Sequence, residues 1–98
     1  METNDLILVT QFCSHQEVEV SFIDALHEFG LIEVVVAADH KYLPQNQLGD
    51  VEKMIRLHYE LDINLEGIDV IANLLNRITD LQTELLAAKN KLKLYEEV

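Results

Sequence analysis

Histidine and cysteine are the side chains in this sequence that could bind a metal ion or attack a substrate. The 98 residues include one cysteine, Cys13, and four histidines: His15, His27, His40 and His58. A zinc site takes three or four ligands at firm spacing. The sequence offers only pairs, Cys13 with His15 and His58 with Asp62 one helical turn on. We therefore expect no bound metal.

Catalytic groups are equally sparse. A nucleophilic cysteine needs a neighbouring base, and no histidine and acid can be assigned to Cys13, which is better explained as a small buried hydrophobe. The three glycines form no phosphate-binding loop. We expect no enzymatic activity and no cofactor. One cysteine cannot form an internal disulfide, which favours a reducing, cytoplasmic location.

Charge is the strongest feature of the composition. The formal net charge is −11, and residues 1–40 contain no Lys or Arg. The same stretch holds eight carboxylates: Glu2, Asp5, Glu17, Glu19, Asp24, Glu28, Glu33 and Asp39. Nucleic-acid binding draws most of its affinity from cations that neutralise phosphates, so we expect a basic protein surface as the partner instead. The alternative is that the acidity only keeps the protein soluble.

The elements that would carry these side chains begin with two short helices. Leu6–Val9 is a strand-like run, and Thr10 is a candidate cap for a helix through Gln16, with Phe12 and Cys13 facing inward. After a connector at Glu17–Val20, Ser21 and Asp24 resemble the capping box of a second helix. Its inward face would hold Phe22, Ile23, Leu26 and Phe29, and Gly30 would end it. This spacing is typical of a helix-turn-helix.

A small wing and a third helix should follow. Residues 31–38 predict a strand, Ala-Asp-His a turn, and 41–43 a returning strand that ends at Pro44. The third helix is expected to start near residues 45–49 and to run to about Leu61. Its apolar side would hold Leu48, Val51, Met54, Ile55, His58 and Leu61.

The last third of the chain predicts one uninterrupted helix, 64–98, with Asn64 as its N-cap. Apolar residues repeat there through four heptads, at Ile71, Leu74, Ile78, Leu81, Leu85, Ala88, Leu92 and Tyr95. Such a seam winds helices around each other, so we expect a dimeric coiled coil. The alternative is that the helix folds back on its own domain.

Two units are therefore predicted, a head at 1–63 and an arm at 64–98, with no flexible linker between them. No apolar run approaches the ~20 residues of a membrane span, and nothing in the sequence marks export. The fold class is mainly α with a small β-hairpin.

The motifs of the head and the junction resemble those of a known family. Phe12-Cys13, the stretch from Gly30 to Glu33, and above all the block from Arg56 to Ile68 followed by leucine heptads are similar to the chaperone modulator CbpM family. This family is a branch of the MerR-like winged-helix proteins, and the resemblance covers nearly the whole chain. It implies a winged helix-turn-helix head with a coiled-coil arm, and it favours antiparallel pairing of two arms.

The resemblance also implies a partner. CbpM-like proteins are small acidic bacterial regulators that bind the J-domain of a CbpA-type co-chaperone and inhibit both its co-chaperone activity and its DNA binding. J-domains present a basic helix, which suits the acidic head. From charge and expected exposure, Glu17, Glu19, Asp24 and Glu28 are the candidate contacts, with Phe12 or Val18 as apolar neighbours. The alternatives are a MerR-like DNA-binding transcription regulator, for which only Lys41 is available on the second helix and wing, and a plain dimerisation module.

Overall fold

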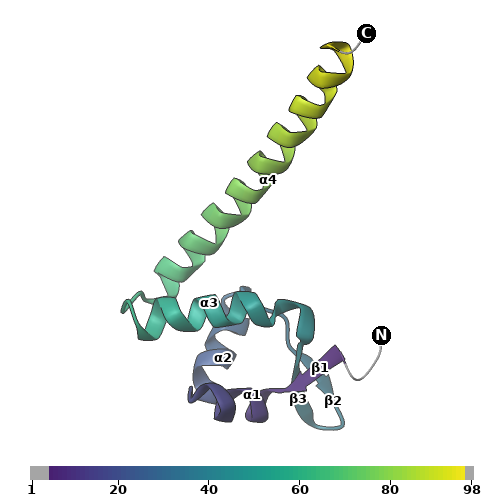
Figure 1. Ribbon diagram of the computed structural model, residues 1–98. Helices are drawn as coiled ribbons and strands as arrows, with labels where there is room; N and C mark the ends of the chain where they lie inside the picture. The colour runs from purple at the N-terminus through teal and green to yellow at the C-terminus, as the bar shows by residue number, and fades with distance from the viewer. Residues whose placement is uncertain (1–4, 97–98) are drawn as a thin grey trace.

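The computed structural model describes residues 5–96 and places a small head at the base of one long helix (Figure 1). The described part measures 59 × 35 × 21 Å. The elements, in chain order, are β1 (Leu6–Leu8), α1 (Val9–Gln16), α2 (Val20–Glu28), β2 (Val35–Ala37), β3 (His40–Pro44), a 3₁₀ turn (Gln45–Gln47), α3 (Leu48–Tyr59) and α4 (Leu65–Glu96).

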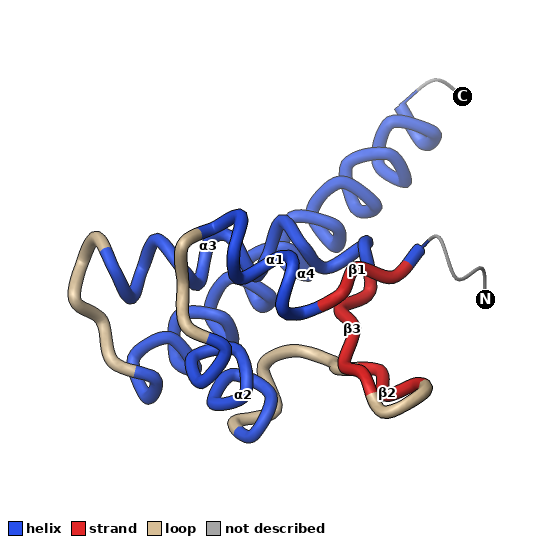
Figure 2. Tube along the Cα trace, turned by 90° about the horizontal axis from the view of Figure 1, so that it is seen from below, coloured by secondary structure: helices blue, strands red, loops and turns tan. Residues whose placement is uncertain are grey.

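The strands form one antiparallel sheet at one end of the head (Figure 2). The order is β1-β3-β2, so β3 pairs with both neighbours. Leu8 lies opposite Tyr42 in one ladder, and Ala37 lies opposite His40 in the other. Ala38 and Asp39 have φ of 51° and 66°, as the two-residue turn of a tight hairpin requires. The predicted wing is therefore present, and β1 adds a third strand to it.

The strand predicted over 31–38 was too long. Only residues 35–37 pair, because the preceding segment satisfies its backbone groups differently. Glu33 N donates to Gln47 Oε1 at 3.0 Å, and Gln47 Nε2 donates to Glu33 O at 2.7 Å. One glutamine side chain thus replaces a sheet partner and ties the loop to the base of α3.

The two short helices are present, but their predicted N-terminal caps were wrong. Leu8 and Glu19 occupy the N-cap positions of α1 and α2, without a side-chain cap hydrogen bond. Thr10 and Ser21 lie inside the helices, and Ser21 Oγ donates to Glu19 Oε2 at 3.2 Å. At both starts the N-cap residue has extended backbone and makes no capping hydrogen bond through its side chain. The true helix starts therefore carry no recognisable capping residue in the sequence.

Both helices end in the same left-handed turn. Gly30 has φ of +76°, and its N–H donates to His27 O while Leu31 N donates to Leu26 O. These two hydrogen bonds form the Schellman motif, and they confirm that Gly30 ends the second helix. At the end of α1 the equivalent position is Glu17, with φ of 58°. A non-glycine residue there carries steric cost.

The hydrophobic core lies between the three head helices, the sheet and the start of α4. Its buried members are Val9, Phe12, Cys13, Phe22, Ile23, Leu26, Ile32, Leu43, Val51, Met54, Ile55 and Ile68. Phe29 and Leu61, expected inside, are 43% and 65% exposed. Phe29 follows the end of α2, and Leu61 follows the end of α3, so neither keeps the helical phase that predicted its burial.

The junction of head and arm is a tight corner between α3 and α4. Asn64 Oδ1 accepts a hydrogen bond from Gly67 N at 2.8 Å, which confirms Asn64 as the predicted cap. The His58 ring stacks on Phe22 at 4.7 Å, and its Nδ1 lies 2.9 Å from Ile63 O. A Cβ on Gly67 would lie 2.7 Å from the Ile63 side chain. The corner is therefore closely packed.

The long helix is predicted correctly over its described length, and the last two residues of the prediction, 97 and 98, lie outside the described part. Its first turns belong to the head, since Ile68 is fully buried and Leu65 and Ala72 pack against the core. From there the helix projects away from the head (Figure 1). The described residues beyond Ala72 are all exposed. Within residues 5–96, none of the helices combines the length and apolar composition needed to cross a bilayer.

Candidate partner-binding surface

The four carboxylates predicted to contact a partner are spread along the first two helices. Glu17 and Glu19 lie in the connection between α1 and α2, and both are exposed. Asp24 and Glu28 are one helical turn apart on α2, on the side opposite buried Phe22 and Ile23. We call Glu17, Glu19, Asp24 and Glu28 the acidic surface. The structure thus places Asp24 and Glu28 on one face of α2, and it places Glu17 and Glu19 just before the N-terminus of the same helix.

Asp24 differs from the other three because it has an ionic partner. Lys41 Nζ on β3 lies 3.2 Å from Asp24 Oδ1, and the two side chains are 54% and 39% exposed. Such an exposed pair contributes little to stability. It does partly neutralise Asp24, so Glu17, Glu19 and Glu28 are the more available charges.

The apolar neighbours predicted for this surface need correction. Phe12 is 6% exposed and belongs to the core, so it cannot contact a partner. Val18 is half-buried and packs against the core. The exposed apolar side chains beside the carboxylates are instead Val20 at 37% and Phe29 at 43%. Sequence reasoning missed both, because helical spacing assigned Phe29 to the inside and Val20 was assigned to the connector.

Cys13 is a core residue with an unreactive environment. It is 3% exposed. Burial first, and the charge of Asp24 second, raise the pKa of the thiol. The protonated form is a poor nucleophile, in keeping with the packing role expected for this side chain.

The histidines do not gather around any point. His15, His27 and His40 are exposed on three different elements, and His58 is held by Phe22 and the Ile63 backbone. Among residues 5–96 no three His, Cys, Asp or Glu side chains are placed to hold a metal ion. The Nδ1 of His58 lies 2.9 Å from Ile63 O, so this ring nitrogen is engaged with the backbone of the corner.

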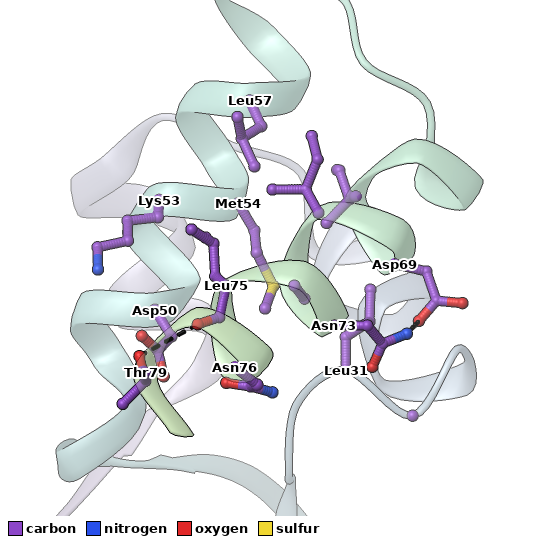
Figure 3. A pocket seen from close by; sticks show the side chains of 14 residues that line it. Leu31, Asp50, Lys53, Met54, Leu57, Asp69, Asn73, Leu75, Asn76 and Thr79 are labelled. Carbon is purple, nitrogen blue, oxygen red and sulfur yellow. Dashed lines mark hydrogen bonds between the residues drawn. The ribbon is translucent and has the colours of Figure 1, made fainter. Parts of the chain in front are cut away.

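A shallow hollow of about 270 Å³ lies between α3 and the first turns of α4 (Figure 3). Its lining is mixed: apolar side chains such as Leu31, Met54 and Leu75 alternate with charged and amide side chains. The hydrogen bonds drawn there run within α4, from Asn73 to Asp69 and from Thr79 to Leu75. No residue of the acidic surface lines it, so the hollow and the predicted site are separate features.

The heptad seam forms a second candidate surface. Six of its members are about half exposed or more: Leu74, Ile78, Leu81, Leu85, Leu92 and Tyr95, between 49% and 71%. Ala88 is exposed, and Ile71 is half-buried at the junction. The seam does not fold back on its own head (Figure 1). A contiguous apolar stripe of this kind is typical of a protein interface.

Together these features define a winged helix-turn-helix protein with a long helical arm. The second helix of its helix-turn-helix carries carboxylates and no Lys or Arg.

Comparison with known proteins then specifies the family. A family model described as MerR HTH family regulatory protein matches residues 7–90, and the chain belongs to this family. No protein of curated function and no solved structure shows significant similarity to the chain.

Proposed function

We propose that the protein is a chaperone modulator of the CbpM type. In this proposal it binds the J-domain of a CbpA-type co-chaperone through the acidic surface, and it inhibits the co-chaperone activity and DNA binding of that partner. It acts without an enzymatic step, in the cytoplasm, as a homodimer joined by the arm. The proposal rests on the sequence resemblance together with the charge of the second helix.

The observation that carries the proposal is the exposed face of α2. In a winged helix-turn-helix that binds DNA, the second helix enters the major groove and approaches two phosphate backbones. Here that face presents Asp24 and Glu28. The wing adds Lys41, which is already paired with Asp24. Such a face repels phosphate and attracts a basic protein helix.

The proposed mechanism is competition. A J-domain uses a basic helix to engage its DnaK-type chaperone, and an acidic surface that covers this helix would block that contact. Val20 and Phe29 could then desolvate part of the interface. The same cover would reduce the positive charge that the co-chaperone offers to DNA.

Calorimetric titration with the isolated J-domain of a CbpA-type co-chaperone tests the proposal. We expect saturable binding that weakens as salt rises from low to moderate concentration, because an acidic-to-basic contact is screened. The opposite result, no heat of binding at tens of micromolar protein, would refute J-domain recognition. A short duplex DNA titrated under the same conditions serves as the control, and binding there would support the DNA-regulator alternative.

A further inference from the structure

One face of the wing carries an exposed apolar side chain. The wing is formed by β2 and β3, and it projects from the head on the side away from α4 (Figure 2). Residues directly opposite each other in an antiparallel pair have their side chains on the same face of the sheet. Val36 lies opposite Lys41, so these two share a face. Leu43, two residues after Lys41, lies on this face as well and is fully buried. The shared face is therefore the one that packs on the core.

The same face of the wing is turned toward α2. Lys41 Nζ lies 3.2 Å from Asp24 Oδ1. Val34, two residues before Val36, packs against the core, whereas Val36 is 67% exposed. The hydrophobic core therefore ends between Val34 and Val36. An apolar side chain continues past its edge, next to Lys41.

Asp24 connects this part of the wing to the acidic surface. It lies one helical turn from Glu28 on α2. Residues 1–52 contain one Lys or Arg, which is Lys41. The two short helices and the wing thus share a single fixed positive charge, and that charge is held at Asp24. Lys41 occupies the position that a cation of a bound partner would take.

The ion pair is weak enough to be exchanged. The side chains of Lys41 and Asp24 are 54% and 39% exposed, and pairs of this kind change an equilibrium constant by at most about fivefold. A second cation at Asp24 would replace the contact that is lost. A pair that only fastened the wing to α2 would act differently, because its removal would loosen the wing and weaken partner binding.

Val36 and Asp24 together match the side chain of a Lys or Arg. Such a side chain lays its methylene stem along an apolar surface while its charged end reaches a polar group. Val36 offers the apolar surface, and Asp24 offers the carboxylate. A basic helix presents several side chains of this kind on one face, so it also reaches Glu28, one turn along α2.

We propose that the wing is part of the partner-binding site, and that Lys41 competes within the chain for the place of the partner's cation. A Lys or Arg of the basic helix displaces Lys41 from Asp24 and packs its stem on Val36. Lys41 therefore lowers the affinity of the acidic surface for its partner. This inference rests on the proposed recognition of a J-domain.

Calorimetric titration with the isolated J-domain at low salt tests the competition. Lys41→Met retains the long side chain and removes its charge, so we expect the affinity to rise about three- to tenfold. Lys53→Met is the matched control, since Lys53 is an exposed lysine on α3, outside the acidic surface and the wing. It changes the net charge equally and should raise the affinity by less than about twofold. In a chain that also carries Asp24→Asn, the effect of Lys41→Met should fall to that of the control.

The outcomes distinguish this inference from the proposed function. If Lys41→Met raises the affinity no more than Lys53→Met, or lowers it as loss of a structural tie would, the competition is overturned while J-domain recognition stands. The same holds if the full rise persists in the chain that carries Asp24→Asn. Absence of J-domain binding by the parent protein overturns the proposed function and this inference with it.

Val36→Thr tests the apolar contact. Threonine keeps the branched shape that suits a strand, but its hydroxyl replaces a methyl group, so affinity should fall about threefold or more. Val70→Thr makes the same change on α4, at a position that is 57% exposed, and should leave J-domain affinity unchanged. Circular dichroism checks the fold of both variants. Unchanged affinity in Val36→Thr overturns the assignment of the wing to the binding site.

Discussion

Lys41 on the wing reaches Asp24 on the second helix, with 3.2 Å between Nζ and Oδ1. This ion pair joins the two elements that a winged helix-turn-helix uses to contact DNA. Its lysine is the one that the alternative DNA-binding hypothesis would need. Breaking the pair would leave the carboxylate of Asp24 on α2 without a cation, so the local field would become more negative.

Reversing Glu17, Glu19, Asp24 and Glu28 to Lys should weaken J-domain binding by at least ~10-fold, since several opposite charges become like charges. Calorimetry at low salt measures the loss, and circular dichroism checks the fold. Among single changes, Glu28→Lys should cost more affinity than Asp24→Asn, because Asp24 already shares its charge with Lys41. Unchanged affinity in the fourfold variant would place the interface elsewhere.

Glu17→Gly should raise the free energy of unfolding by about 0.5–1 kcal/mol. Glycine adopts the left-handed conformation without the steric cost that glutamate has at φ of 58°. Gly30→Ala is the reverse substitution at the matching position of α2, where φ is +76°. It should lower the free energy of unfolding by about 1 kcal/mol or more. Urea denaturation measures both. Glu17→Gly also removes a carboxylate of the acidic surface, so it should gain stability and lose J-domain affinity together. Equal stability of the parent and Glu17→Gly would mean that the turn is not strained.

Ile68→Ala should destabilise the protein by about 2–5 kcal/mol, because it opens a cavity at a fully buried position. Leu81→Ala removes a similar volume at a position 55% exposed in the single chain, so it should act on the dimer instead. Thermal unfolding at two protein concentrations separates the cases. The Ile68 effect should be present at both concentrations, and the Leu81 effect should fade on dilution. A large loss in the Leu81 variant at high dilution would contradict this view of the arm.

The stability of the protein should decline at alkaline pH partly because of Cys13. Burial raises the pKa of this thiol in the folded protein, whereas the unfolded chain ionises near its ordinary value of ~8.5. The contribution is therefore complete below that value and is lost as pH rises toward the folded pKa. Urea midpoints from pH 7 to 10 measure the decline, and Cys13→Ala should flatten it. Rapid reaction of the native thiol with a disulfide reagent at pH 8 would show that it is not protected.

The elements that sequence reasoning placed correctly are those with strong periodicity or a distinctive cap. The heptads predicted α4, Asn64 predicted its start, and Gly30 predicted the end of α2, because each signal is local. The predicted caps of α1 and α2 were wrong for the opposite reason. The true N-cap residues, Leu8 and Glu19, form no capping hydrogen bond, so the nearby hydroxyl residues Thr10 and Ser21 were predicted as caps instead.

The features that escaped prediction depend on residues distant in the chain. Nothing in the sequence near Glu33 indicates that Gln47 will take the place of a strand. Similarly, β1 has no local sign that it will pair with β3, and Phe29 has no local sign that the end of α2 will turn it outward. For the acidic surface, charge identified exposed residues, but the pairing of Asp24 with Lys41 required the sheet to be in place.

Because α4 is continuous from buried Ile68 to Glu96, any rotation of the helix at the corner is transmitted along its whole length. A tilt of about five degrees at the corner would carry the tip through roughly 4 Å over a length of about 42 Å. In an antiparallel pair, one heptad of slip changes the separation of the two heads by about 10 Å. In a homodimer joined by the arms, the register of the two helices would therefore set the distance between the two heads.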